Sequence, residues 1–282
     1  MEIIKRRRES QQLKYKGDQC FYQEKLDEAL VEYTNALEKD KENEYALGNI
    51  GLVYMLKSDH EKCIEYSTKA LEAIDRFQNE TKSFSKQNVL EIKIRLRRAR
   101  TYQTTNEFEK AKNDLDKILL LDHQNAEAGQ LLKQVQVKLD DVTFGVYKEK
   151  GNELLKKKQF VAALEQYDQA LRVTRKATTL DNISVYVNRI ACLLSLDKLD
   201  RVISECNEAI RLIRNYRNRF NVKGADLERL NQMDLRVAVR RGNALGKLQR
   251  ISEAIAEYER ALKIDPNNNA VKKDLDLLRK AK

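Results

Sequence analysis

The chain has 282 residues, of which 41% are hydrophobic, and this supplies enough apolar surface to build a core and to exclude wholesale disorder. One Pro, nine Gly and no Trp argue against an all-β fold, and no apolar run reaches the roughly 18 residues that a membrane span requires. The net charge of +10 favours a partner that seeks positive charge, such as nucleic acid, an acidic peptide tail or an anionic membrane surface.

The chain opens with MEIIKRRRES, which is basic but is not followed by an apolar region, so it does not predict a secretory signal. We set residues 1–9 apart as a basic N-terminal segment. From there the chain repeats itself, because LKYKGDQCFYQEKLDEALVEYTNAL (13–37) matches YKEKGNELLKKKQFVAALEQYDQAL (147–171) with Gly17 opposite Gly151. The match predicts two homologous halves.

A shorter period, close to 34 residues, runs inside each half. Gly17, Ala29, Tyr33 and Ala36 are followed by five further sets: Gly51, Cys63, Ser67 and Ala70; Ala99, Ala111, Leu115 and Ile118; Gly151, Ala163, Tyr167 and Ala170; Ile190, Val202, Cys206 and Ala209; Gly242, Ala254, Tyr258 and Ala261. Small residues at fixed offsets let two helices cross closely, and the larger residues fill the seam between them. The pattern predicts pairs of antiparallel helices.

The pairs form two sets of three, and each set ends in a further amphipathic helix, at residues 126–140 and 269–281. We expect these helices to cap the sets, since the last pair would otherwise expose an apolar face. The polar insertions at 77–90 and 216–232 predict helix extensions plus a loop. We therefore expect a first domain at 10–140 and a second at 141–282, with either a hinge or a continuous helix around Gly145.

The period and the pattern of small and large residues resemble the tetratricopeptide repeat, which consists of two antiparallel helices. Pro266, the only proline, follows the last helix pair, where that family often places one. The resemblance covers nearly the whole chain. It implies an all-α solenoid of six helix-turn-helix repeats whose first helices line a concave groove.

In the second set, five polar residues fall on these groove-lining helices: Lys148, Asn152, Asn188, Arg236 and Arg240. Three cations and two amides suit a chain terminus that carries two carboxylates, because charge-assisted bonds and amide N–H groups satisfy its oxygens. The set resembles the dicarboxylate clamp of co-chaperone tetratricopeptide domains, with Arg236 in place of the usual Lys. Arg keeps the charge but presents a different hydrogen-bonding fork.

In the first set, the corresponding residues are Lys14, Asp18, Asn49, Lys93 and Arg97. Here Asp18 replaces the first Asn of the clamp. A carboxylate at this position repels incoming carboxylates and could pair with Lys14 instead. We therefore expect a weakened or altered clamp in the first set.

Other classes of function find less support in the sequence. His60 and His123 lie on different repeats without a nucleophile or carboxylate signature, so neither an enzyme nor a metal or other cofactor is predicted. The four cysteines show no ligand spacing and are expected to be buried thiols in a reducing compartment. Nucleic acid is a weaker candidate despite the Arg-rich strings, because aromatic residues make up only 7% of the chain.

Within the clamp proteins, residues 235–280 resemble the dynein axonemal assembly factor 4 family, and residues 94–122 resemble the sperm-associated antigen 1 family. This resemblance implies a non-enzymatic, cytoplasmic adaptor that binds the acidic C-terminal tails of seventy- and ninety-kilodalton heat-shock chaperones. Its clients would be dynein subunits before their transport into cilia. The alternative is a structural scaffold of a ciliary or other large assembly, in which tubulin tails or other axonemal proteins occupy the same grooves.

Overall fold

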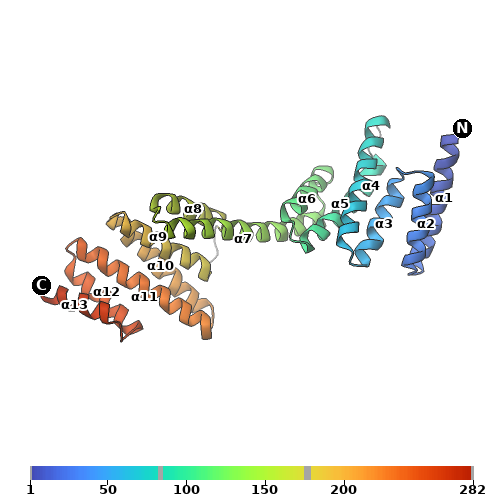
Figure 1. Ribbon diagram of the computed structural model, residues 1–282. Coiled ribbons are helices and arrows are strands. Elements are labelled where there is room, and N and C mark those ends of the chain that lie inside the picture. The colour runs from blue at the N-terminus through green and yellow to red at the C-terminus, as the bar shows by residue number, and fades with distance from the viewer. Residues whose placement is uncertain (1, 82–84, 175–178, 281–282) are drawn as a thin grey trace. The chain divides into compact units, whose positions relative to one another are not determined.

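The computed structural model describes residues 2–81, 85–174 and 179–280, and every regular element in these ranges is an α-helix (Figure 1). The helices are α1 (Glu2–Tyr22), α2 (Leu26–Lys39), α3 (Glu44–Leu56), α4 (His60–Thr81), α5 (Ser85–Thr104), α6 (Phe108–Leu121), α7 (Ala126–Lys156), α8 (Phe160–Val173), α9 (Leu180–Ser195), α10 (Leu199–Arg219), α11 (Gly224–Lys247), α12 (Ile251–Ile264) and α13 (Asn269–Lys280). This confirms the predicted all-α class. The chain divides into two compact units, residues 1–139 and 140–282.

Tight turns join the helices that pack as pairs, such as α1 with α2 and α3 with α4 (Figure 1). Each turn places one residue in the left-handed region, at φ between 54° and 62°: Glu24, Ser58, Asn106, Lys158, Asp197 and Gln249. In the first turn, the Lys25 amide donates to the Cys20 carbonyl at 3.0 Å, which satisfies a carbonyl at the end of α1. The recurrence of this turn explains why the helices return antiparallel.

The connections before α3, α7 and α13 share a second recurring device, an Asp-x-x-Asn sequence. The Asn side chains accept hydrogen bonds from helix N–H groups: Asn43 from Ala46 (3.0 Å), Asn125 from Ala128 (3.0 Å) and Asn268 from Val271 (3.2 Å). Such caps satisfy N–H groups that have no partner within the helix. His123 lies in the second of these connections, with its Nδ1 3.4 Å from the Leu119 carbonyl oxygen.

The repeated small and large residues of the second helices form the core, as predicted. All eighteen are at most 3% exposed: Ala29, Tyr33 and Ala36; Cys63, Ser67 and Ala70; Ala111, Leu115 and Ile118; Ala163, Tyr167 and Ala170; Val202, Cys206 and Ala209; Ala254, Tyr258 and Ala261. The predicted capping helices also contribute. Leu131 and Val135 of α7 pack in the core cluster of α5 and α6, and Leu275 of α13 packs in the cluster that contains Tyr258. Both helices therefore cover apolar faces.

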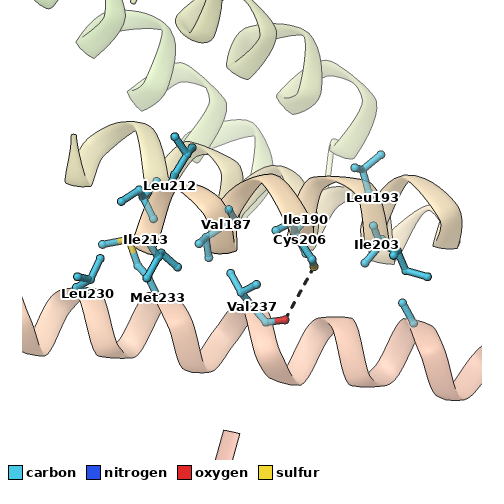
Figure 2. Close-up of a cluster of buried hydrophobic side chains, with 14 of the residues drawn as sticks. Val187, Ile190, Leu193, Ile203, Cys206, Leu212, Ile213, Leu230, Met233 and Val237 are labelled. Atoms are coloured by element: carbon cyan, nitrogen blue, oxygen red, sulfur yellow. Dashed lines mark hydrogen bonds between the residues drawn. The ribbon is translucent and has the colours of Figure 1, made fainter. Parts of the chain in front are cut away.

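Figure 2 shows the largest of these clusters, in which α9, α10 and α11 bring together Val187, Ile213 and Met233. The Cys206 thiol lies in it, 3.9 Å from the Val237 carbonyl oxygen. Burial raises the pKa of the Cys206 thiol to about 12. Cysteines 63, 192 and 206 are all buried, as expected of structural thiols, whereas Cys20 is half-buried.

The polar insertions lengthen helices, as predicted. The second insertion extends α10 to Arg219 and begins α11 at Gly224, with a short loop between them. The first extends α4 to Thr81 and begins α5 at Ser85, and residues 82–84 lie outside the described ranges. Of the two alternatives for the segment around Gly145, the structure has the continuous helix, α7. The basic residues 2–9 form the first turns of α1.

Candidate functional site

The five residues predicted in the first set line one cavity of about 370 Å³. Lys14 and Asp18 come from α1, Asn49 from α3, and Lys93 and Arg97 from α5. The first helix of each pair therefore supplies the polar wall, as the repeat pattern predicts. Aromatic and aliphatic side chains complete the lining, among them Phe21, Tyr22, Tyr33, Tyr45, Leu52, Val89 and Leu90.

Asp18 is fully engaged by its neighbours in this cavity. Its Oδ1 accepts hydrogen bonds from the Tyr33 hydroxyl at 2.9 Å and from the Asn49 amide at 2.8 Å. Its Oδ2 accepts from the Lys14 ammonium at 2.8 Å. The Lys14 ammonium also lies 5.5 Å from the centre of the Tyr45 ring. The carboxylate therefore neutralises the cation beside it.

Asn152 occupies the matching position in the second set and has matching partners. Its Oδ1 accepts from the Tyr167 hydroxyl and from the Asn188 amide, both at 2.9 Å. Because Oδ1 takes both hydrogen bonds, the Nδ2 group is left as a donor, and its hydrogen bond to Glu149 Oε2 is long, at 3.4 Å. An amide thus retains a donor where Asp18 presents only acceptors.

Lys148, the first cation of the second set, is paired within the unit. Its ammonium lies 3.0 Å from Asp181 Oδ1, and Arg229 donates to the same oxygen at 2.8 Å. Burial opposes ionisation of Asp181, but the hydrogen bonds from Arg229 and Lys148 outweigh it and lower the pKa of this carboxyl. Asp181 and Arg229 join the site from the start of α9 and from the extended part of α11.

The arginines of the two sets are held alike. Arg97 donates to the Gly48 carbonyl, and Arg240 donates to the Val187 carbonyl at 2.6 Å, in each set one residue before the amide of Asn49 or Asn188. Burial lowers the pKa of Arg97 to about 10. Burial, followed by repulsion from Arg236, lowers the pKa of Arg240. Within the described ranges neither guanidinium has a carboxylate partner, so an anionic ligand would supply the missing countercharge.

Lys93 and Arg236 stand one turn before these arginines, on α5 and α11. Both side chains are exposed, and neither makes an ion pair with any residue that the structure describes. The structure therefore brings all five predicted residues of the first set into one cavity. In the second set, one direct hydrogen bond joins Asn188 to Asn152, and the contacts of Lys148 and Arg240 place them beside the same helix, α9.

The tyrosine hydroxyls and Asp181 are functional groups that the sequence did not reveal. The tyrosines were predicted as core residues, and their rings do fill the core against glycine. A Cβ added at Gly151 would lie 2.5 Å from Tyr167 Cε1, so the glycine is required for the ring to approach. The recurring Gly and Tyr, sixteen residues apart, were the signal for this contact. Asp181 has no counterpart in the repeat pattern.

Several arginines of the basic strings are engaged in internal ion pairs. Arg98 binds Asp114 with two hydrogen bonds of 2.7 Å, and Arg95 donates to the same carboxylate at 3.1 Å. Asp114 is only 1% exposed, so the network belongs to the interior of the first unit. Two arginines of the string IKIRLRRAR therefore stabilise the folded unit and do not form a free basic surface.

In the described part of the chain, no helix is long and apolar enough to cross a membrane.

The family profiles match this chain in four places. The TPR repeat matches residues 17–58, and the tetratricopeptide repeat matches residues 45–75, 92–125 and 237–268. Together with the paired helices and their recurring turns, these matches show that the chain contains tetratricopeptide repeats within residues 17–75, 92–125 and 237–268.

Two curated relatives illustrate the similarity. Dynein axonemal assembly factor 4 of Rattus norvegicus is 34% identical over 132 residues, which cover 47% of this chain and 28% of that protein. The Hsp70-Hsp90 organizing protein of Triticum aestivum is 24% identical over 269 residues, which cover 89% of this chain and 40% of that protein. The chain thus spans well under half the length of either relative.

Among solved structures, the TPR2AB domain of yeast Sti1, determined as a pHSP90 complex, matches with a TM-score of 0.51 at 20% identity. The match covers 95% of this chain and 96% of that chain. It confirms the tetratricopeptide-repeat fold that the sequence predicts.

Proposed function

We propose that this protein is a non-enzymatic adaptor and that its second set binds acidic C-terminal tails of heat-shock chaperones. We call Lys148, Asn152, Asn188, Arg236 and Arg240 the second clamp. In this proposal the first three hold the terminal carboxylate, and the two arginines engage acidic side chains upstream of it. Binding needs no bond to be made or broken, because charge-assisted hydrogen bonds supply the affinity.

The observation that carries the proposal is the pair of arginines without an acidic partner in the described residues. Arg236 is exposed, and Arg240 is partly buried with only a backbone carbonyl to accept its hydrogen bond. Retaining two such cations one turn apart costs free energy through desolvation and mutual repulsion, which a dicarboxylate ligand would offset. The Asn152 amide, whose Nδ2 group makes only a long hydrogen bond to Glu149, adds a neutral donor to the second clamp.

The relatives support the choice of partner. The Hsp70-Hsp90 organizing protein aligns over most of this chain, and its name describes a protein that organises these two chaperones. Dynein axonemal assembly factor 4 aligns over about half of this chain, and its name describes assembly of axonemal dyneins. We therefore propose a cytoplasmic co-chaperone-like role in which dynein subunits or other axonemal proteins are clients.

Calorimetric titration with a peptide that ends in Glu-Glu-Val-Asp tests the clamp. The peptide should bind as the free acid and lose most of its affinity as the C-terminal amide. Arg236→Ala should weaken binding by about tenfold or more, the loss of one charge-assisted interaction. Lys157→Ala, which removes an exposed charge in the turn after α7, is the matched control. Equal losses from the two variants would contradict the assignment.

The structural scaffold is the second candidate, and the neutralised Lys14–Asp18 pair of the first set favours it. A scaffold component would stay with axonemes after detergent extraction, whereas a transient assembly factor would extract with the cytoplasm. Fractionation of ciliated cells, followed by immunoblotting of both fractions, separates the two roles.

A further inference from the structure

The cavity of the first set is divided into a neutral end and a cationic end. At the α1 end, Lys14 and Asp18 form an ion pair of 2.8 Å, with both side chains only about one-fifth exposed. At the α5 end, Lys93 and Arg97 have no carboxylate partner among the described residues. An anionic group that enters this cavity is therefore attracted to α5 and away from α1.

The neutral end cannot receive a terminal carboxylate. Asp18 uses Oδ1 to accept from Tyr33 and Asn49 and uses Oδ2 to accept from Lys14. It has no N–H group to donate, and its charge repels an arriving carboxylate. Asn152 has the same two partners on Oδ1 but keeps an amide donor. The two sets therefore differ at the side chain that would bind a terminal carboxylate, which is Asp18 in the first set and Asn152 in the second.

The rest of the cavity wall is apolar and accessible. Phe21, Leu52 and Leu90 line it, together with Tyr22 and Val89, whose side chains are 84% and 57% exposed. A ligand that covers these apolar side chains removes their surface from water, and this contributes about 25 cal/mol of binding free energy for each Å² covered. A bulky apolar side chain next to the bound anion would cover this surface.

We propose that the first cavity binds an internal segment of a partner protein, with one acidic side chain on Lys93 and Arg97 and a neighbouring bulky apolar side chain against the aromatic and aliphatic wall. The segment needs no free C-terminus. This site is separate from the second clamp and does not depend on it. The chain would then hold two unlike ligands, one by its terminus and one by an internal sequence.

The test uses the full chain with the second clamp disabled by Lys148→Ala and Arg236→Ala, which we call the blocked chain. The probe is the peptide acetyl-Gly-Ser-Leu-Glu-Phe-Ser-Gly-amide, titrated by calorimetry beside the same peptide with Gln in place of Glu. The Glu peptide should bind about tenfold more tightly, as expected for one charge-assisted interaction. Adding Lys93→Ala should reduce this preference severalfold, because only Arg97 then remains to bind the acidic side chain, whereas Lys117→Ala, at an exposed lysine of α6, should leave it unchanged.

A second comparison examines the terminus. The blocked chain should bind the free-acid and amide forms of the Glu peptide equally. Asp18→Asn should create a severalfold preference for the free acid, because Asn retains the acceptor for Tyr33 and Asn49, adds a donor and releases Lys14. Absence of Glu-peptide binding, equal binding of the Gln peptide, or a preference for the free acid before Asp18 is changed would overturn the inference. Failure of the second clamp would appear in a separate titration. The chain with Lys148 and Arg236 intact would then bind the free-acid and amide forms of the chaperone-tail peptide with equal affinity.

Discussion

Asp181 competes with any carboxylate ligand for the first cation of the second clamp. Its Oδ1 lies 3.0 Å from the Lys148 ammonium and 2.8 Å from an Arg229 guanidinium nitrogen. A ligand carboxylate that binds Lys148 must share or displace this contact. We therefore expect Asp181→Asn, which removes the charge with little change in shape, to increase the affinity for an acidic C-terminal peptide.

The size of the increase follows from the exposure of the pair. The side chain of Asp181 is 47% exposed, and that of Lys148 is 18% exposed. Ion pairs near the surface contribute about 0.2–1 kcal/mol, and we expect the upper half of this range because two cations share one carboxylate. Since about 1.4 kcal/mol corresponds to a tenfold change in Kd, affinity should rise about three- to fivefold. The increase should shrink at high salt, where exposed charges are screened.

The assay is calorimetric titration of both proteins with the free-acid Glu-Glu-Val-Asp peptide. Removing any carboxylate makes the protein more basic, so a matched control is needed. Asp197→Asn provides it, because Asp197 lies in the turn after α9 and pairs at 2.6 Å with Lys247, which is not a clamp residue. An unchanged or weaker affinity for Asp181→Asn, or an equal increase in the control, would refute the competition between Asp181 and the ligand.

Three further predictions concern packing, buried charge and thiol chemistry. Gly151→Ala would place a Cβ 2.5 Å from Tyr167 Cε1, and we expect urea denaturation to show a loss of about 1–3 kcal/mol; an unchanged midpoint would contradict the required close approach. Asp114→Ala leaves two largely buried arginines without their shared carboxylate and should cost about 3–5 kcal/mol, against about 0.5 kcal/mol or less for Asp116→Ala, whose side chain is 45% exposed. A thiol reagent applied to the native protein at neutral pH should modify Cys20 first, because the other three cysteines are buried. Mass spectrometry of the labelled peptides checks this order, and early labelling of a buried cysteine would contradict the packing.

The candidate residues were accessible to sequence reasoning because helical spacing and the repeat offsets are local and regular. Lys14 and Asp18 are one turn apart on any helix, and the offset that aligns Gly17 with Gly151 also aligns Asp18 with Asn152. The pairing of Lys14 with Asp18 could be expected for the same reason. The repeat pattern also marked the tyrosines as core residues, although it gave no sign that their hydroxyls orient Asp18 and Asn152.

The sequence by itself determined the all-α class, the paired helices, their buried positions and the helices that could line a binding surface. The tertiary structure alone decided which charges of the second clamp are compensated. Asp181 reaches Lys148 from the start of α9, and Arg229 reaches Asp181 from an insertion that lengthens α11. Neither contact follows a repeat offset, because each joins side chains that only the packing of non-adjacent helices brings within hydrogen-bond distance. The periodic pattern thus fixes the scaffold, and the non-periodic contacts decide which of its cations remain available to a ligand.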